Sequence, residues 1–374
     1  MVTPHASPDC LVAGCRAGFE REAAADLARA AALLDASIDV DAPEGEGMVV
    51  GRLLPPATSR AVARLADARP VAARNLFVGA GPVALLRGDA QRPDRVAPLL
   101  AAIDALDPEA HSAAWRAPYV EHPDTNDGKA LSPLARALAA RIAAALAAKG
   151  RLRDDAPRRL HVFLRDGGTA WVGTSDAAST PWPLGIPRIR VPAGAPSRSA
   201  AKLAEALVVF LGESAGELLR PGMRAVDLGA APGGWSWLLA SKGLRVTAVD
   251  NGPLKGAAAA DPLIAHVRAD GLSYRPRRPV DWLVCDMVER PARIAALVAD
   301  WIAEGAARHA IFNLKLPMKK RYDEVRACEA LVARRMRATG TPFALALRQL
   351  YHDREEVTGF LSRERRCAQP SRFV

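Results

Sequence analysis

The stretch Arg224–Asp250, RAVDLGAAPGGWSWLLASKGLRVTAVD, decides how the second half of the chain folds. Its apolar run Ala225–Leu228 predicts a buried strand, the glycine-rich residues that follow predict a tight turn, and Trp235–Lys242 has the pattern of a helix. Arg245–Val249 then alternates as a second buried strand. The sequence therefore predicts a strand–turn–helix–strand unit in which a ligand can approach bare backbone at the turn.

This turn departs from two common nucleotide sites. Ala231 stands where G-x-G-x-x-G has the glycine that makes room for a pyrophosphate, and no Walker lysine follows the turn. An acidic residue does follow at a suitable interval, because Asp250 lies about 20 positions after Gly229. A carboxylate at the end of the second strand can reach ribose hydroxyls. The interval disfavours a merely structural turn, and the departures disfavour NAD as the ligand.

The residues Asp227–Gly234 have the pattern D-x-G-x-x-P-G-G, which resembles the cofactor loop of S-adenosylmethionine-dependent methyltransferases. With Trp235 the loop is similar to that of the branch that methylates the ribose 2′-oxygen of RNA. The resemblance implies that the methionine part of S-adenosylmethionine lies against this loop, that Asp250 binds the adenosine ribose, and that Asp270 lies near the adenine. The other cofactor contacts that it implies are Ser199, Gly229, Ala231, Pro232, Gly233, Gly234 and Asp286.

Bulk properties indicate a globular protein with a polyanionic partner. The 374 residues are enough for two or three domains. The net charge of +10 favours a nucleic acid as partner, although an Arg-rich, Ala-rich composition can also reflect coding bias. Five cysteines without metal-ligand spacing predict reduced thiols and no metal site. The sequence shows no signal-peptide pattern and no apolar run of membrane-spanning length, so we expect a cytoplasmic protein that does not enter a membrane. It gives no sign of an obligate protein partner, and we expect a monomer.

The first half of the chain predicts two α+β units. Residues 1–56 contain an amphipathic helix at Glu20–Leu34 and two strands. Residues 57–175 include the polar turn Asp124-Thr125-Asn126, a long helix at Pro133–Lys149 and a β-hairpin, a combination that resembles a THUMP RNA-binding domain. The other predicted elements are Ser37–Val40, Met48–Leu53, Ser59–Ala68, Asn75–Val78, Ala97–Leu106, Ala113–Val120, Leu160–Arg165 and Thr169–Gly173. A run of arginines beside the hairpin suits RNA phosphates, or forms an ordinary solvated face; it comprises Arg151, Arg153, Arg158 and Arg159.

Five prolines mark residues 176–196 as the linker between the two halves. Apolar residues such as Trp182 predict that this linker packs on one of the domains. A helix follows, whose start Ser197 or Ser199 can cap. Lys202 lies in its first turn, where a cation opposes the helix dipole. For this lysine taken alone, solvent exposure is the simplest interpretation.

Residues 197–374 alternate strands and helices, which predicts a Rossmann-like, doubly wound α/β domain with a mainly parallel sheet. The elements beyond Asp250 are predicted at Leu263–Arg268, Val280–Cys285, Arg293–Ala303, Ala310–Leu314, Lys319–Ala338, Phe343–Leu350 and Val357–Leu361. Ligands of this fold bind beyond the carboxyl ends of the strands. Polar residues fall at or near several of these ends, which indicates one shared site; they are Asp227, Asp250, Asp270, Asp286 and Lys315.

A ribose hydroxyl is a poor nucleophile until a base removes or polarises its proton. Burial or a second lysine lowers the pKa of a lysine, whereas a carboxylate raises it, and the sequence leaves open which effect wins. Lys202, Asp286, Lys315 and Glu356 resemble the Lys-Asp-Lys-Glu tetrad of RNA ribose 2′-O-methyltransferases. The resemblance implies that Lys315 accepts the proton, that the two acids orient the lysines, and that Lys202 keeps Lys315 partly neutral or binds the hydroxyl oxygen. Glu356 is preferred over the adjacent glutamate because the family has valine directly after this glutamate, as this chain does.

Several segments together resemble the bacterial 23S rRNA ribose 2′-O-methyltransferases that modify a cytidine. They are PSRSAAKL, VDLGAAPGGW, VDNGP, CDMVE, FNLKLPMKKRY and RQLYHDREEVT, with WPLGIPR and CRAGFEREAA upstream. The resemblance covers most of Ser197–Thr358 and implies 23S rRNA, or its large-subunit precursor, as the partner. Ala231 departs from the family, which has cysteine there, and this change should not touch the chemistry.

Rival functions make different demands on the residues. RNA cytosine-C5 methyltransferases need a thiolate nucleophile, and Cys285 lies at an apolar strand end without a Pro-Cys setting, which favours a buried structural thiol. Base-amine methyltransferases place Asp/Asn-Pro-Pro-Tyr after the fourth strand, where this chain has Asp286-Met287-Val288-Glu289. An RNA base methyltransferase is the alternative among enzymes, and a non-catalytic RNA-binding factor is the alternative outside them. An inactive relative should lack Lys315 or Asp286, and both are present.

Overall fold

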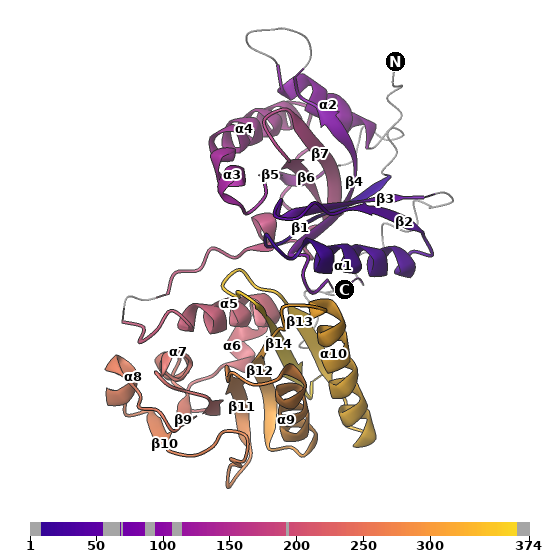
Figure 1. Cartoon of the computed structure of the whole chain (residues 1–374). Helices are drawn as coiled ribbons and strands as arrows, with labels where there is room; N and C mark the ends of the chain where they lie inside the picture. Colours follow the sequence, from indigo (N-terminus) through magenta and orange to yellow (C-terminus); the bar gives the residue numbers. More distant parts are fainter. Residues whose placement is uncertain are drawn as a thin grey trace. The chain divides into compact units, whose positions relative to one another are not determined.

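The computed structural model describes residues 9–54, 68, 70–86, 94–106, 114–191 and 194–364. The chain divides into two compact units, Met1–Ile186 and Pro187–Val374 (Figure 1). The helix predicted at Ser59–Ala68 lies outside the described residues except for its last position. Within the described part of the chain, no helix is long and apolar enough to cross a bilayer.

One seven-stranded sheet forms the centre of the first unit, in the order β2-β3-β1-β4-β7-β6-β5. Its strands are β1 (Cys10–Gly14), β2 (Ile38–Asp41), β3 (Met48–Leu53), β4 (Asn75–Ala84), β5 (Arg116–Glu121), β6 (Arg158–Leu164) and β7 (Thr169–Asp176). Neighbouring strands are antiparallel except for the parallel edge pair of β5 and β6. The predicted hairpin is present as β6 and β7.

Strand β1 joins the two modules that the sequence predicts for the first half of the chain. It pairs with β3 on one side and with β4 on the other, so strands from residues 1–56 and 57–175 belong to one sheet. All five residues of β1 are buried, and a short run buried on both faces lacks the alternation that marks a strand in sequence. The sequence pattern therefore does not reveal β1, and without it the sheet looks like two modules.

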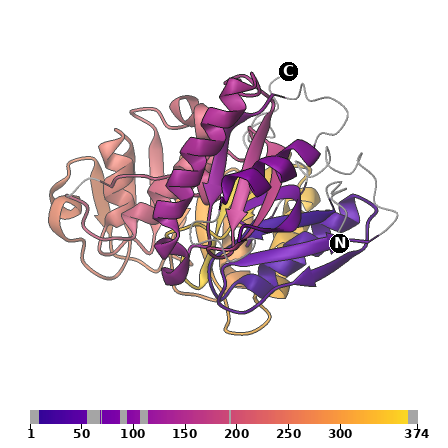
Figure 2. The same cartoon turned by 90° about the horizontal axis from the view of Figure 1, so that it is seen from above.

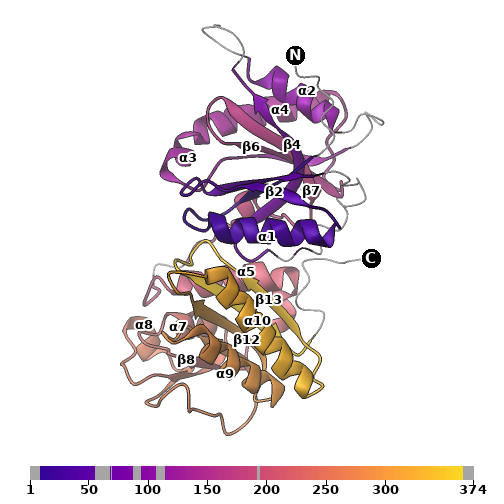
Figure 3. The same cartoon turned by 45° about the vertical axis from the view of Figure 1, so that its right-hand side comes forward.

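The helices of the first unit cover different parts of the sheet (Figure 3). They are α1 (Glu20–Leu33), α2 (Val96–Ala105), α3 (Asn126–Ala130) and α4 (Ser132–Ala148). The first packs against β2 and β3, whereas α2 and α4 pack over β4, β5 and β7. In α4, the long purple-magenta helix of Figure 2, Leu138, Ile142 and Leu146 are buried at four-residue spacing and form a core with Trp115 and Val162.

The start of the linker packs on this first unit, as the sequence predicts for the linker as a whole. Leu184 in the short 3₁₀ helix η2 (Pro183–Gly185) is buried, as is Ile186. The backbone N–H of Leu184 donates to the buried carboxylate of Glu121 at the end of β5. Glu121 also accepts from Asn75 Nδ2 at 3.1 Å and lies 2.9 Å from His161 Nδ1. This one carboxylate thus connects β4, β5, β6 and the linker.

The second unit is the predicted doubly wound α/β domain, with the sheet order β10-β9-β8-β11-β12-β14-β13. The strands are β8 (Arg224–Leu228), β9 (Arg245–Val249), β10 (Ile264–Val267), β11 (Val280–Cys285), β12 (Ala307–Lys315), β13 (Ala344–Arg348) and β14 (Glu356–Ser362). The first five of these run parallel, and β14 alone is antiparallel to its neighbours β12 and β13. The helices are α5 (Ala200–Leu211), α6 (Ala215–Leu218), α7 (Gly234–Ser241), α8 (Gly256–Ala260), α9 (Pro291–Ala303) and α10 (Arg321–Ala338).

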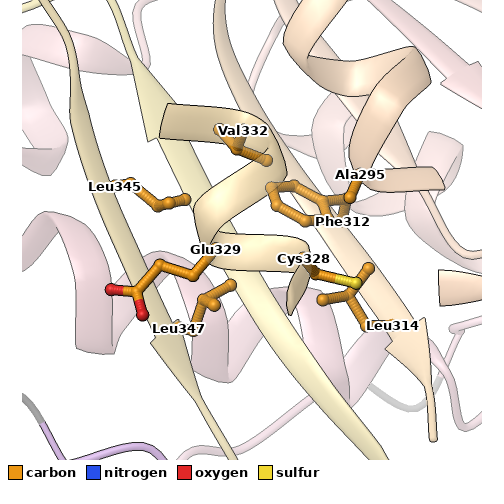
Figure 4. Close-up of a pocket in the computed structure, with 8 residues that line it drawn as sticks. All are labelled: Ala295, Phe312, Leu314, Cys328, Glu329, Val332, Leu345 and Leu347. Atoms are coloured by element: carbon orange, nitrogen blue, oxygen red, sulfur yellow. The ribbon is translucent and has the colours of Figure 1, made fainter. Parts of the chain in front are cut away.

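Alternate residues of the strands face two different helix layers. Trp282, Ile311 and Phe360 pack in one core with α5 and α7. On the other side, Phe312 and Leu314 of β12 line a small apolar gap with residues of α10 (Figure 4). Because side chains alternate along a strand, positions 313 and 315 face the α5 side, as Ile311 does.

We predict that Glu121→Ala destabilises the first unit by roughly 3–5 kcal/mol, because several buried donors lose one shared acceptor. Hydrogen exchange should report faster exchange in β5 and β6, while β11 in the second unit serves as an internal reference. The matched control is Glu44→Ala, which removes an exposed glutamate from the same unit. Equal protection of β5 and β6 in both variants would contradict the proposed role of Glu121 in the fold.

Candidate active site

The glycine-rich turn between β8 and α7 packs so closely against neighbouring residues that larger side chains would collide with them. Gly229 and Gly233 have positive φ angles of 76° and 109°. A Cβ on Gly229 would lie 2.5 Å from Met287 Cγ, and a Cβ on Gly234 would collide with the Ser197 hydroxyl. Glycine is therefore required at these positions for the backbone conformation and close packing of the turn, which follows the carboxyl end of β8.

Asp250 holds this turn from the end of β9. Its carboxylate accepts from Ala231 N at 2.9 Å and from Gly252 N at 2.7 Å. Each carboxylate oxygen can accept a further hydrogen bond, so the group fits the hydroxyls of a ribose. Asp270 is exposed after the edge strand β10, where it accepts from Leu272 N. It lies at the outer end of the row of predicted ligands.

Ser199 lies beside the turn but does not cap α5 in the way the sequence predicts. Its backbone is helical, with φ −64° and ψ −22°, whereas a capping residue has extended backbone. Its hydroxyl lies 2.7 Å from the Ser197 hydroxyl, and its carbonyl accepts from Trp235 Nε1 at 2.9 Å. These contacts attach the start of α5 to the glycine-rich turn.

Four charged residues converge at the carboxyl edge of the sheet. Lys315 at the end of β12 donates to Asp286 at 2.5 Å and to Glu356. Lys202 on α5 forms an ion pair with Glu356 and lies 3.6 Å from Asp286. The structure therefore brings together all four residues of the predicted tetrad, although they are far apart in sequence. The side chain of Lys202 is 17% exposed, so solvent exposure is the wrong interpretation of this lysine.

Strand register explains how Glu356 reaches this edge. Because β14 runs antiparallel to β12, its first residue is the direct partner of the last residue of β12, and Glu356 pairs with Lys315. The segment before β14 is attached to α5, where buried Glu205 accepts from Tyr351 N at 2.8 Å and from His352 N at 2.9 Å. Glu205 lies about one helical turn after Lys202. One helix therefore supplies both a lysine of the cluster and the anchor for the segment that precedes Glu356.

The charges of the cluster shift its pKa values in opposite directions. Burial lowers the pKa of Lys315, but Asp286 and Glu356 outweigh burial and raise that pKa above its ordinary value. Burial raises the pKa of Glu356, but hydrogen bonds from Lys202 and Lys315 outweigh it and lower that pKa. The sequence leaves open whether burial or the carboxylates have the larger effect on the pKa of Lys315, and here the carboxylates do. Lys315 is therefore an ammonium in the free protein at neutral pH.

Asp227 and Cys285 are two further buried titratable residues near the turn. Asp227 at the end of β8 accepts from the Ser236 hydroxyl at 2.7 Å, and burial raises its pKa to about 7. Its Oδ1 atom has no hydrogen-bond partner among the described residues. Burial also raises the pKa of the Cys285 thiol to about 12, which disfavours the thiolate that a cytosine-C5 methyltransferase needs.

Sequence reasoning missed three polar residues around the cluster. They are Glu205, Asn313 and Asp353, all of which are buried. Asn313 donates to Asp286 at 3.0 Å, and Asp353 lies in the segment before β14. A weak signal exists for Asn313, because a polar residue two positions before Lys315 falls on the same face of the strand. Glu205 and Asp353 resemble ordinary surface acids in sequence.

We predict that Asp227→Asn changes how stability depends on pH. Since the pKa of Asp227 is higher in the folded chain than in the unfolded chain, the folded chain binds more protons between about pH 4 and 7, and the wild type loses stability as pH rises through this range. The asparagine variant lacks this loss, so its stability relative to wild type should rise up to about pH 7 and then level off. Chemical unfolding at several pH values measures the difference. Asp323→Asn, at an exposed position of α10, is the control; a difference from wild type that stays flat across this range would refute the shift.

Comparisons with known proteins match most of the chain. A model described as FtsJ-like methyltransferase matches residues 195–338, and a model described as ribosomal RNA large subunit methyltransferase M, N-terminal, matches residues 94–176. Among solved structures, TrmN from Thermus thermophilus covers 94% of this chain and is itself covered to 98%, at 18% identity and a TM-score of 0.34. That likeness is too weak to bear on function.

Curated relatives give a much stronger match. A protein from Methylococcus capsulatus is 47% identical over 357 residues, which cover 95% of this chain and 98% of the relative. A protein from Laribacter hongkongensis is 47% identical over 93% of this chain and 95% of the relative, and one from Thauera aminoaromatica is 44% identical over 97% and 99%. All three carry the name ribosomal RNA large subunit methyltransferase M. At this identity along nearly its whole length, the chain belongs to the ribosomal RNA large subunit methyltransferase M (RlmM) family of methyltransferases.

Proposed function

We propose that this protein methylates the ribose 2′-hydroxyl of a cytidine in 23S rRNA, with S-adenosylmethionine as methyl donor and Lys315 as general base. The observation that carries the proposal is the convergence of Lys202, Asp286, Lys315 and Glu356 at one edge of the sheet. Large-subunit rRNA as substrate is supported by the names of the relatives. The choice of cytidine rests on the family resemblance alone.

The residues around the glycine-rich turn fit the proposed cofactor. S-adenosylmethionine, when bound, supplies an electrophilic methyl group on a positively charged sulfur. The family resemblance assigns the methionine part to the backbone of Gly229, Gly233 and Gly234, and Asp250 offers acceptors for ribose hydroxyls. Asp286 lies between this turn and Lys315, because β11 is adjacent to both β8 and β12. This order supports a cofactor site next to the proposed base.

The amine of Lys315 must be neutral before it can accept a proton. Asp286 and Glu356 hold its Nζ atom in place, and their charges also favour the ammonium form. Loss of one proton to solvent therefore precedes catalysis. The 2′-hydroxyl proton then passes to Lys315 Nζ, which leaves the oxygen as the stronger nucleophile. Lys202 remains paired with Glu356 and compensates its charge.

Side chains around this edge suit an RNA acceptor. Val288 and Met318 follow the ends of β11 and β12 and are 91% and 84% exposed, the highest values among the exposed large apolar residues described. Lys319 and Lys320 come next in the chain and are exposed. Exposed apolar side chains can pack on a nucleobase that has left its stack, and lysines can neutralise phosphates. The two loops therefore offer contacts for a nucleotide and its flanking backbone.

The arginine run of the first unit contributes less exposed charge than its sequence suggests. Arg151 and Arg159 are buried; the first pairs with Asp104 at 2.5 Å, and the second donates to Ala117 O at 3.0 Å. Arg153 is exposed and pairs with Asp155. Arg158 is also exposed. Two of the four arginines thus have structural roles, Arg153 is already paired with a neighbouring carboxylate, and exposed Arg158 is the best candidate of the four for a phosphate contact.

The alternatives have weaker support. A cytosine-C5 methyltransferase needs a reactive thiolate, and Cys285 is fully buried with a raised pKa. A non-catalytic RNA-binding factor would have no need of two lysines held by two acids beside a glycine-rich turn.

We predict that Lys315→Met lowers the rate of methyl transfer to rRNA by about 10²- to 10⁴-fold, the usual contribution of a general base. Cofactor affinity should change little, because Lys315 is not among the proposed cofactor contacts. Transfer of labelled methyl to rRNA that lacks the modification, followed by mapping of 2′-O-methylation, measures the effect. The wild-type rate should rise with pH as Lys315 loses its proton. Normal turnover by this variant, or a methyl group on a base, would overturn the proposal.

We predict that the double variant Lys319→Gln, Lys320→Gln weakens RNA binding and makes it less sensitive to salt, because fewer phosphates are neutralised. The expected change in the salt slope is about one per lost contact. RNA affinity measured at several salt concentrations tests this. The matched control is Lys242→Gln, an exposed lysine at the end of α7, near the opposite edge of the sheet. If the control and the double variant lose affinity equally, these loops do not contact the RNA.

A further inference from the structure

A chain of buried polar contacts extends from the segment before β14 to the charged cluster. The Thr358 hydroxyl lies 3.0 and 2.9 Å from the two carboxyl oxygens of Asp353, and 2.9 Å from Asn313 Oδ1. Asn313 Nδ2 in turn donates to Asp286 Oδ1 at 3.0 Å, the same oxygen that Lys315 contacts. Asp353, Thr358 and Asn313 are all fully buried.

The number of available hydrogens determines which group donates in each of these hydrogen bonds. Asp286, which faces two lysines, is a carboxylate and can only accept, so the Asn313 amide must turn its nitrogen to Asp286 and its oxygen to Thr358. The single hydroxyl hydrogen of Thr358 then goes to Asn313. A hydrogen between Thr358 and Asp353 must therefore come from Asp353, which requires a protonated carboxyl group. Burial raises the pKa of Asp353 well above its ordinary value, which agrees with this count.

We propose that Asp353, Thr358 and Asn313 form a one-way hydrogen-bond relay, with Asp353 as a neutral acid, and that this relay fixes the Asp286 carboxylate that holds Lys315. The three are positioning residues, and their effect on catalysis rests on the proposed function of Lys315. The relay ends one carboxylate away from the proposed base.

The sheet makes the relay rigid. Asn313 and Thr358 are direct partners across β12 and β14, as Lys315 and Glu356 are two residues further along. Both pairs face the α5 side of the sheet, because side chains two positions apart share a face. Leu350 N donates to Asp353 at 2.9 Å and fixes the other end of the relay. A small displacement of Asn313 would move Asp286, and displacement of a group near the reacting atoms lowers the rate of reaction.

The relay should also affect the proton affinity of Lys315. The charged groups that face this lysine are Asp286 after β11, Glu356 on β14 and, through these acids, Lys202 on α5. If Asp286 is no longer held toward Lys315, its attraction for the ammonium weakens. The pH at which the rate of methyl transfer rises should then move downward.

Paired substitutions test the relay. Thr358→Val and Asp353→Leu remove a hydrogen that the relay needs, and we expect kcat to fall by about 10- to 100-fold, with a nearly unchanged KM for RNA. Thr358→Ser keeps the hydroxyl, and Asp353→Asn keeps a donor and an acceptor in the same shape, so both should retain kcat within a few-fold. The pH–rate profile should shift to lower pH only in the first pair.

A buried hydroxyl elsewhere on β14 supplies the structural control. Ser362 lies at the far end of the strand and its hydroxyl lies 2.9 Å from His309 Nδ1. Ser362→Ala should lower the melting temperature about as much as Thr358→Val while leaving kcat and the pH profile unchanged. If Thr358→Val behaves like this control, or Asp353→Asn fails like Asp353→Leu, the relay is refuted.

A second measurement separates this inference from the proposed function. Wild-type protein that transfers no methyl group to rRNA would overturn the proposed function. The protonation of Asp353 does not depend on that result, because the ¹³C shift of its carboxyl carbon reports it directly, with the resonance assigned by its loss in Asp353→Asn. A protonated carboxyl at neutral pH supports the relay, and an ionised one refutes it.

Discussion

The site depends on the antiparallel pairing of β14 with β12. Parallel strands deliver only their last residues to the carboxyl edge of a sheet, and each is followed by a loop that must leave that edge. An antiparallel strand begins at the same edge, so its first side chain lies opposite the last side chain of its neighbour. Glu356 and Lys315 are such a pair. Their contact follows from backbone register, which is far more rigid than a contact between two loops.

Charge balance makes the cluster tolerable inside the protein. Two lysines and two acids meet where each side chain is at most 24% exposed, and unpaired charges would be expensive there. Each lysine contacts both acids, so no single pair carries the cost of burial alone. This balance has a chemical consequence, because the same carboxylates that position Lys315 also oppose the loss of its proton. The contacts that position Lys315 therefore also favour its protonated form, which cannot accept a proton.

The sequence predicts the strands and the turn of the second unit better than it predicts the buried residues that hold the charged cluster in place. Alternation and turn residues locate β9 and β11 at their observed bounds, and the spacing from Gly229 to Asp250 identifies the turn that Asp250 holds. Strand β1 is not predicted, because a short, fully buried run has no alternation of apolar and polar residues. Lys202, taken alone, suggests solvent because its partner lies more than 150 residues away. Glu205 and Asp353 are not predicted because an acid shows no sign of its burial in sequence when that burial results from the fold.

At three buried acids near the same edge of the sheet, the contacting groups determine whether burial raises or fails to raise the pKa of the carboxyl group. Asp227 and Asp353 contact hydroxyl and N–H groups, and burial raises the pKa of each. Glu356 is buried too, yet two ammonium groups lower its pKa. Burial alone therefore favours neutral acids, and at Glu356 the contacts with two lysines reverse its effect. The contacts of Glu356 with Lys202 and Lys315 thus favour its charged form, whereas burial favours the neutral forms of Asp227 and Asp353, which contact no lysine among the described residues.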